Sequence, residues 1–210
     1  MKGKILSLNY KESIDFLLPK HYSGRKPNIK HSYGWYIDKR LVAVCTFGKP
    51  ASNSLCVGVC GKEYSQKVYE LNRLCSIDEL EYPLSSFVSA CLRRIKNIEG
   101  WIIVSYADTA MGHNGYIYQA CNFIYTGMTK KRTDKYTAGN KHSRHYEKDS
   151  KNEYRKVRSP KHRYIYFAMK KKEKIKAMSR LRYNIEEYPK GENSNYKLGE
   201  YLQPEVIKCR

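Results

Sequence analysis

A change of periodicity within residues 101–127 constrains the fold of this chain more than any other feature. The apolar run Trp101-Ile-Ile-Val104 is typical of a buried strand, and it ends at the polar tetrapeptide Ser105-Tyr-Ala-Asp108. A glycine-punctuated turn, a helical pattern near 113–121 and a second apolar segment at 123–127 follow. This order predicts an open α/β sheet, in which ligands bind beyond the carboxyl ends of strands. The polar tetrapeptide is therefore a candidate for chemistry.

The other hydrophobic patterns extend this segment to a whole domain. Further strands are predicted at 4–8, 33–37, 41–47, 68–75 and 162–169, and helices at 10–18, 83–95 and 170–182. Residues 48–67 are punctuated by Gly, Ser and Pro, and we expect them to form a loop. The order β-α-β-β-β-α-β-α-β-insert-β-α predicts an α/β (α+β) fold, with a mixed central sheet flanked by helices and a basic insert before the last strand.

Charge is concentrated in one block of the chain. The 40 Lys and Arg against 20 Asp and Glu give a net charge of +20, and residues 130–182 hold +15 of it. This asymmetry predicts a polyanionic partner, and it favours double-stranded DNA over an anionic membrane. We expect one domain over 1–182. Within it, the insert 129–160 lacks apolar periodicity and is predicted to be a disordered arm that clamps DNA. Residues 183–210 are predicted to be a polar tail.

Two further patterns concern the cellular environment. No apolar run approaches twenty residues, and the apolar stretch at the N-terminus is too short for a signal peptide, so we expect no membrane segment. Seven Cys without a CxxC pair indicate reduced, intracellular thiols. Cys56 and Cys60 are expected on one face of a strand, as small buried residues rather than a metal pair.

Several short motifs, taken together, resemble known families. Tyr118-Gln-Ala-Cys-Asn-Phe123 followed by Gly127 resembles the end of a GNAT-type N-acetyltransferase domain, with Asn122 in the place of a glycine. More specifically, the chain resembles the phage Mom proteins from residue 15 to residue 190. That resemblance is carried by Glu70-Leu-Asn-Arg-Leu74, Ser105-Tyr-Ala-Asp108, Gly112-His113 and Asn122-Phe123.

The resemblance to Mom implies a specific activity. Mom proteins are DNA-modification enzymes that attach a carbamoylmethyl group to the N6 amine of adenine, which protects the DNA from host restriction. It therefore implies a phage-encoded transferase with a divergent GNAT-like fold, acting in the cytoplasm of a bacterial host. Since N6 is paired inside a duplex, such an enzyme must flip the base out of the stack.

Two catalytic candidates follow from the predicted strands. The carboxylate of Asp108 either caps the turn after its strand or acts as base or hydrogen-bond acceptor for the poorly nucleophilic exocyclic amine. Arg73 lies in a predicted central strand, where a charge is costly unless it is paired. Because Glu70 would face the opposite side of a regular strand, Arg73 is expected to find another anion, such as Asp108 or a phosphate.

Three more catalytic candidates depend on the resemblances. Tyr118 is either a core tyrosine with its hydroxyl bonded or, as in acetyltransferases, the residue that protonates a thiolate leaving group. The resemblance to Mom implies that His21 and Tyr22 belong to the active pocket. There an imidazole could shuttle a proton and a tyrosine could stack on a flipped base. The alternative is that His21 is a surface residue.

The binding candidates form two sets. Ser85 and Ser86 either cap a helix or occupy the place where acetyltransferases hold the coenzyme A pyrophosphate, but residues 76–84 carry three acids and no glycine, which suits a pyrophosphate poorly. The predicted substrate- or cofactor-binding residues are Ser85, Ser86, Asn72, Ser105, His113 and Asn122. The predicted DNA-binding residues are Lys130, Lys131, Arg132, Lys141, Arg144, Arg155, Lys156, Arg158, Lys161 and Arg163.

Other classes of function and several properties stay open. A GNAT-type N-acetyltransferase acting on a protein or a small amine would require acetyl-CoA or a related donor. A non-catalytic nucleic-acid-binding protein would need no pocket. The sequence leaves the donor unknown, implies iron through the family resemblance alone, and contains no ligand cluster that demands a metal. It also leaves the oligomeric state open, a dimer included.

Overall fold

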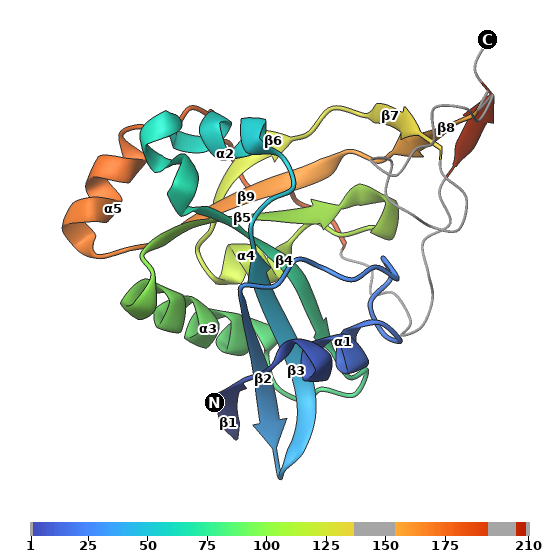
Figure 1. The fold of residues 1–210 in the computed structure, drawn as a ribbon, viewed down its shortest axis with the longest axis vertical. Coiled ribbons are helices and arrows are strands. Elements are labelled where there is room, and N and C mark those ends of the chain that lie inside the picture. Colours follow the sequence, from blue (N-terminus) through green and yellow to red (C-terminus); the bar gives the residue numbers. More distant parts are fainter. Residues whose placement is uncertain (1, 137–153, 193–204, 209–210) are drawn as a thin grey trace.

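A computed structural model describes residues 2–136, 154–192 and 205–208, and in these the chain forms one large sheet with helices on both faces (Figure 1). The strand order is β1-β2-β3-β4-β5-β9-β6, and the β4–β5 pair is parallel while its other pairs are antiparallel. The strands are β1 (Lys4–Ser7), β2 (His31–Ile37), β3 (Arg40–Gly48), β4 (Val68–Ser76), β5 (Trp101–Asp108), β6 (Ile124–Met128) and β9 (Lys161–Ala168). The predicted mixed α/β sheet is confirmed.

Alternation along the strands separates two cores. Trp101 and Ile103 of β5 face the core beneath α3 (Leu84–Ile98) and α4 (Tyr116–Ala120), while Ile102 and Val104 face the opposite core. Helices α2 and α5 cover that opposite face, and α1 packs against β3 on the same side. The bounds of these helices are α1 (Tyr10–Leu17), α2 (Asn53–Cys60) and α5 (Lys171–Met178).

A β-bulge and a splay between strands open the centre of the sheet. Thr46 of β3 pairs with Arg73 and the next residue, Phe47, pairs with Leu71, so Asn72 is the extra residue of a bulge in β4. The parallel register of β4 and β5 runs from Val68↔Ile102 to Glu70↔Val104, although both strands continue beyond it. The carboxyl halves of β4 and β5 therefore diverge, and a ligand can enter between them.

The insert was predicted to lack structure, and this was wrong for its two ends. β7 (Arg132–Lys135) and β8 (Tyr154–Arg158) pair with each other, and β10 (Val206–Lys208) adds to β8 to form a second, three-stranded sheet. Thr133 and Val157 give the hairpin β-branched residues, and pairing with a distant segment supplies hydrogen bonds that local periodicity does not reveal. Residues 137–153 lie outside the described part of the chain.

Two other expectations need correction. Residues 48–67 are not a loop but contain α2 and a 3-10 helix, η1 (Lys62–Lys67). Cys56 and Cys60 thus share a helix face, and both are buried in the core against β5 and β9. The start of the tail is also anchored, because the Tyr188 hydroxyl donates to the Phe123 carbonyl at 2.7 Å.

Candidate active site

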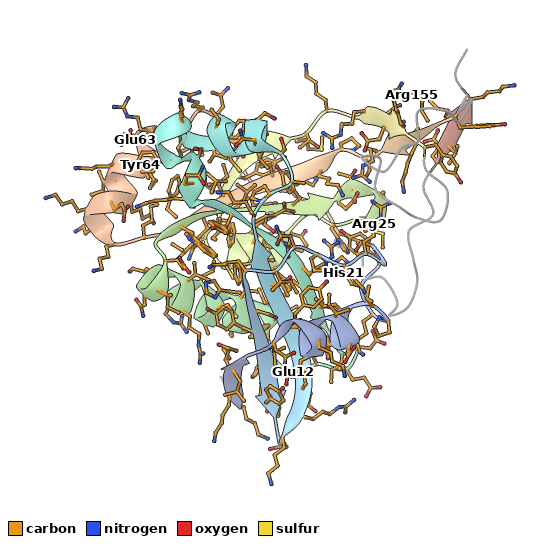
Figure 2. The ribbon with its side chains drawn as sticks, viewed as in Figure 1. Glu12, His21, Arg25, Glu63, Tyr64 and Arg155 are labelled. Atoms are coloured by element: carbon orange, nitrogen blue, oxygen red, sulfur yellow. The ribbon has the colours of Figure 1, made fainter. Side chains whose placement is uncertain are left out.

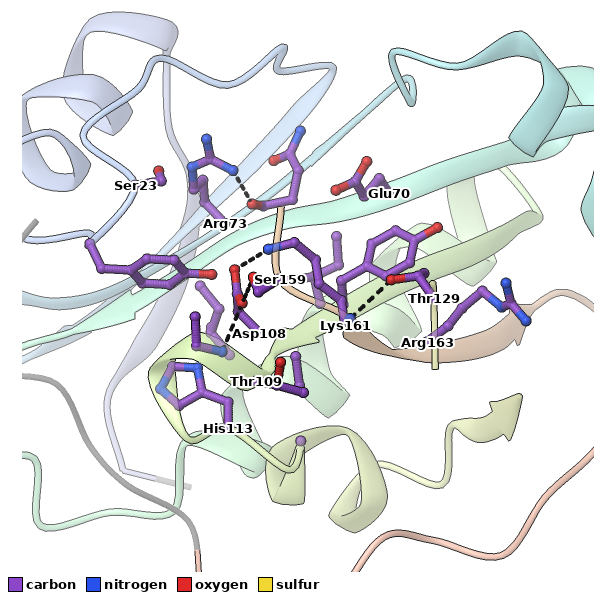
Figure 3. A pocket seen from close by; sticks show the side chains of 18 of the residues that line it. Ser23, Glu70, Arg73, Asp108, Thr109, His113, Thr129, Ser159, Lys161 and Arg163 are labelled. Atoms are coloured by element: carbon purple, nitrogen blue, oxygen red, sulfur yellow. Dashed lines mark hydrogen bonds and ion pairs between the residues drawn. The ribbon is translucent and has the colours of Figure 1, made fainter. Parts of the chain in front are cut away.

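One cavity of about 1270 Å³ lies where β4 and β5 diverge. Its walls come from the loop after α1, the carboxyl halves of β4 and β5, the turn before α4, and the β8–β9 connection. The side chains on these walls converge from segments far apart in the sequence (Figure 3). The predicted catalytic residues Asp108, Tyr118, Arg73, His21 and Tyr22 all line this cavity.

Asp108 is the most firmly held side chain of the cavity. Only 3 % of it is exposed, and its Oδ1 accepts hydrogen bonds from the Ala110 backbone N–H at 3.1 Å and from the Ser159 hydroxyl. The ammonium of Lys161 donates to its Oδ2 (Figure 3). Register explains this pairing, because Asp108 and Lys161 lie opposite each other on β5 and β9. Asp108 therefore caps the following turn and forms an ion pair within the cavity.

The bulge in β4 brings Glu70 and Arg73 to the same cavity. We expected them on opposite sides of a regular strand, and this was wrong because the extra residue at Asn72 shifts the alternation. Burial raises the pKa of Glu70 above its ordinary value, while Arg73 and Lys161 lower it less. Arg73 donates from Nη1 to the Asn72 carbonyl at 2.6 Å and from Nη2 to the Arg25 carbonyl at 3.3 Å. It therefore fixes the loop after α1 to the central strand.

The loop after α1 contributes a stacked pair of rings. His21 and Tyr22 have ring centroids 4.4 Å apart, and Tyr22 meets His113 edge-on at 6.0 Å. Burial, followed by Arg73, His113 and Lys161, lowers the pKa of His21 well below its ordinary value. Burial also lowers the pKa of His113, although the nearby Asp108 carboxylate raises it by a smaller amount. His21 is thus a buried, neutral imidazole and not a surface residue.

Tyr118 and Ser105 lie at the point where β4 and β5 separate. Ser105 is fully buried and donates from its hydroxyl to the Leu71 carbonyl at 3.0 Å. Burial raises the pKa of Tyr118 to about 12, while a hydrogen bond with Ser105 lowers it less. Tyr118 is therefore protonated at neutral pH and can donate a proton into the cavity.

Of the other predicted binding residues, Asn72 lines the cavity, whereas Ser85, Ser86 and Asn122 do not. Ser85 and Ser86 lie in the first turn of α3, where neither hydroxyl caps the helix, and it is Leu84 that lines the cavity. Asn122 is an exposed turn residue with a left-handed φ of 59°, which asparagine tolerates better than most residues. Asn72 lines the cavity, and its amide donates to the Asn28 carbonyl at 2.7 Å.

The predicted DNA-binding residues divide into three groups. Lys141 and Arg144 lie outside the described residues, and Arg155 donates to the Thr133 hydroxyl at 2.8 Å away from the cavity wall. Arg155 lies on β8 of the small sheet, as Figure 2 shows. The others line the cavity, namely Lys130, Lys131, Arg132, Lys156, Arg158, Lys161 and Arg163.

Glu70 was not predicted as a site residue, and three further residues of the cavity were missed or assigned another role. Lys161 was expected to bind DNA, but it forms an ion pair with Asp108. Ser159 and Arg25 were not proposed for any role, although both line the cavity. Their position depends on the pairing of β5 with β9 and on the path of the loop after α1. Neither can be read from local sequence periodicity.

Metal binding requires several ligand side chains close together. Over residues 2–136, 154–192 and 205–208, no three His, Cys, Asp or Glu side chains gather as a group that could hold an ion. His21, His113 and Asp108 share the cavity, but both imidazoles contact Tyr22 and the carboxylate forms an ion pair with Lys161. The iron implied by the family resemblance is therefore not matched by these donors, and we assign no step to a metal. The same residues also contain no helix that could span a membrane.

Comparisons with known proteins place this fold in a family. The N-acetyltransferase from Staphylococcus aureus Mu50 is similar, with a TM-score of 0.50 and 12% identity over 80% of this chain and 99% of that chain. An acetyltransferase from Bacillus subtilis in complex with CoA is also similar. Its TM-score is 0.47, with 15% identity over 79% of this chain and 99% of that chain. No curated protein matches. The sheet is thus GNAT-like, and because the family model matches residues 4–190, this chain belongs to the Mom protein family.

Proposed function

We propose that this chain is a DNA-modification transferase that adds a carbamoylmethyl group to the N6 amine of adenine and so protects DNA from restriction. Membership of the Mom family and the GNAT-like sheet support a transferase of this class. The adenine substrate and the group transferred are the parts we propose. The donor would be a carbamoylmethyl compound with a leaving group on its methylene carbon.

The charge of the cavity wall is the observation that carries this proposal. Nine Lys and Arg side chains line the cavity against four Asp and Glu. Such a wall repels small cationic amines and attracts a polyanion. A neutral base carried by a phosphate backbone suits it, because its phosphates contact the cations while its base reaches the inner side chains. The cost of flipping the base, a few kcal/mol, would be offset by these contacts.

Two of the four carboxylates that line the cavity, those of Asp108 and Glu70, suit different roles. Asp108 is almost fully buried and engaged by three donors, so we propose that it positions Lys161 and accepts a hydrogen bond from the incoming amine. Glu70 lies on the cavity wall, and among the described residues its carboxylate accepts no hydrogen bond. We propose that Glu70 takes the proton that N6 loses as the nitrogen–carbon bond forms.

The remaining inner residues would orient the base and the donor. Tyr22, stacked on His21, offers an aromatic face for the adenine ring. Tyr118 would donate its proton to the leaving group, which its raised pKa permits at neutral pH. Leu80, Tyr82 and Tyr118 line the cavity and pack against the core beneath α3.

Mass spectrometry tests the proposed function. Cells expressing the chain would be compared with cells expressing Glu70→Gln or the matched surface control Asp38→Asn, and their DNA digested to nucleosides. We expect deoxyadenosine carrying the mass of a carbamoylmethyl group with the wild type and the control, and none with Glu70→Gln. Unmodified deoxyadenosine in all three strains, from well-expressed folded protein, would refute the proposed function.

The acetyltransferase-like sheet is also compatible with a second function, N-acetyl transfer. An N-acetyltransferase of this fold would bind acetyl-CoA, and isothermal titration of the purified chain measures that directly. Tight binding of acetyl-CoA together with unmodified DNA would favour acetyl transfer to a protein or small amine. The many cations of the wall make a cationic amine the less suitable substrate.

A further inference from the structure

Three basic side chains meet at the mouth of the cavity from two distant segments. Arg25 comes from the loop after α1, while Lys156 and Arg158 lie two residues apart on β8 and so share a face. The hydrogen bond from Arg73 to the Arg25 carbonyl, at 3.3 Å, fixes the first segment to the central sheet. The three side chains are each partly buried, and all line the cavity.

These three cations share one partly buried carboxylate, that of Asp134. Asp134 Oδ2 lies 3.1 Å from Arg158 Nε, and the same carboxylate acts on Arg25 and Lys156. Burial and neighbouring Arg side chains lower the pKa of both Arg25 and Lys156. Gathering like charges away from water is unfavourable unless an anion compensates them. The cluster therefore favours the binding of an anion at the cavity wall.

A buried hydroxyl beside the cluster supports the same conclusion. Ser23 lies between His21 and Arg25 in the chain and lines the cavity (Figure 3). Its Oγ is buried and has no hydrogen-bond partner among the described residues. Unsatisfied buried polar groups are uncommon, and a ligand or water is one explanation. A tetrahedral anion could accept bonds from this hydroxyl after a small shift and from Arg25, which binds phosphate through two N–H groups.

The position of the cluster identifies which phosphate it would bind. Arg158 is followed directly by Ser159, which donates to Asp108, and Arg25 lies four residues after His21. The anion site and the inner catalytic residues are thus joined by two very short stretches of chain. We propose that Arg25, Lys156 and Arg158 bind the backbone phosphate next to the nucleotide whose base enters the cavity. This inference rests on the proposed function, because it assumes that the base is part of DNA.

The test removes the charge of one phosphate at a time. The probe is a G/C duplex with a single adenine, opposite an abasic site, in which the linkage 5′ or 3′ of that adenine is a neutral methylphosphonate. Binding is measured by fluorescence anisotropy at fixed salt. For the wild type we expect one of these two linkages to weaken binding about tenfold, as for the loss of one charge-assisted contact. A methylphosphonate placed five linkages away should weaken it much less.

Protein variants then show whether Arg25 contacts that phosphate. In Arg25→Gln, binding of the unmodified duplex should fall about tenfold, and the sensitive methylphosphonate should cause less than a further twofold loss. Arg25→Lys should restore part of the sensitivity. Arg40→Gln, which removes the same charge from the distant β2–β3 hairpin, should behave as the wild type. Circular dichroism and thermal midpoints confirm that each variant is folded.

Several results would overturn the inference. These are equal sensitivity of wild type and Arg25→Gln, insensitivity at both linkages, and failure of the wild type to bind the duplex. Loss of coenzyme A binding in Arg25→Gln, without any effect of the DNA linkages, would assign the anion to a donor pyrophosphate instead. Because the assay measures binding alone, it can succeed where no modified adenine forms, and that outcome would refute the proposed function and leave the phosphate site standing.

Discussion

Substitution of Asp108 should reveal how strongly the cavity depends on its ion pair with Lys161. The change Asp108→Asn keeps the shape and the acceptor for the Ala110 N–H but removes the charge. Breaking a fully buried pair costs roughly 3–5 kcal/mol. Since Lys161 keeps 30% of its side chain exposed, water compensates part of this, and we expect about 2 kcal/mol. For a chain of this size the melting temperature should fall by roughly 4–8 °C.

A double-mutant cycle separates the ion pair from other effects. Lys161→Met alone should also destabilise, because it leaves the Asp108 carboxylate buried with only its two remaining donors. The double variant should be more stable than the sum of the single changes predicts, by about 1–2 kcal/mol. Urea unfolding can be followed through Trp35 and Trp101, which are both buried. Asp38→Asn, which breaks an exposed pair with Lys2, should leave the midpoint unchanged.

The same variants distinguish structure from chemistry. We expect Asp108→Asn to lose DNA modification while its affinity for DNA stays within a few fold, because the cations that we propose to contact phosphate remain. If Asp108→Asn has the same midpoint of urea unfolding as the wild type, the ion pair does not stabilise the fold, and the role that we assign to it is wrong. If instead modification survives within a few fold, Asp108 is a turn cap with no part in the reaction.

Four other perturbations follow from the site. Because burial raises the pKa of Glu70, modification should decline on acidification with a midpoint above pH 4.5, and Glu70→Gln should lower its rate about 10²–10⁴-fold at pH values above that midpoint. The low pKa of His21 means that only the unfolded chain takes up this proton near pH 6.5. Stability should therefore be complete above that pH and fall below it by at most about 1.4 kcal/mol per unit, a slope that His21→Phe should reduce in urea titrations. Tyr118→Phe should lower the single-turnover rate about 10²-fold without changing DNA affinity. Replacing Lys131 and Arg132 with Gln should flatten the slope of log affinity against log salt by about 0.9 per lost phosphate contact.

The sequence predicts the large sheet well because its strands and helices have strong local periodicity. α3 carries an amphipathic stripe and was predicted close to its observed bounds, whereas β5 was predicted to end near Ser105 and continues to Asp108. The small basic strands β7 and β8 were missed for the opposite reason. They bury little apolar surface, and their hydrogen bonds depend on each other and on β10. Helix α2 was missed because Gly and Ser there suggested a loop.

The five predicted catalytic residues line one cavity, but Glu70 was not among them and the contacts between these side chains were not predicted. Glu70 and Arg73 were separated by the alternation rule of a regular strand, and the bulge at Asn72 breaks that rule. Lys161 was counted among the DNA-binding cations, since nothing local shows that it lies opposite Asp108. A bulge and a strand register are long-range properties, set by how β4 and β9 pair with their neighbours. Residue types therefore indicate the chemistry, while pairing decides which groups meet.

The connection between β8 and β9 links the small basic sheet to the buried carboxylate of Asp108. Arg158 ends β8, Ser159 donates to Asp108, and the Pro160 carbonyl accepts a hydrogen bond from the Thr109 hydroxyl at 2.7 Å. Any displacement of β8 by a phosphate on Arg158 must therefore act on the residues that hold Asp108. If the proposed phosphate site is right, binding and chemistry share this segment of three residues, and phosphate binding on Arg158 should stabilise the geometry around the carboxylate. A free base, which lacks the phosphate, would gain only the inner contacts.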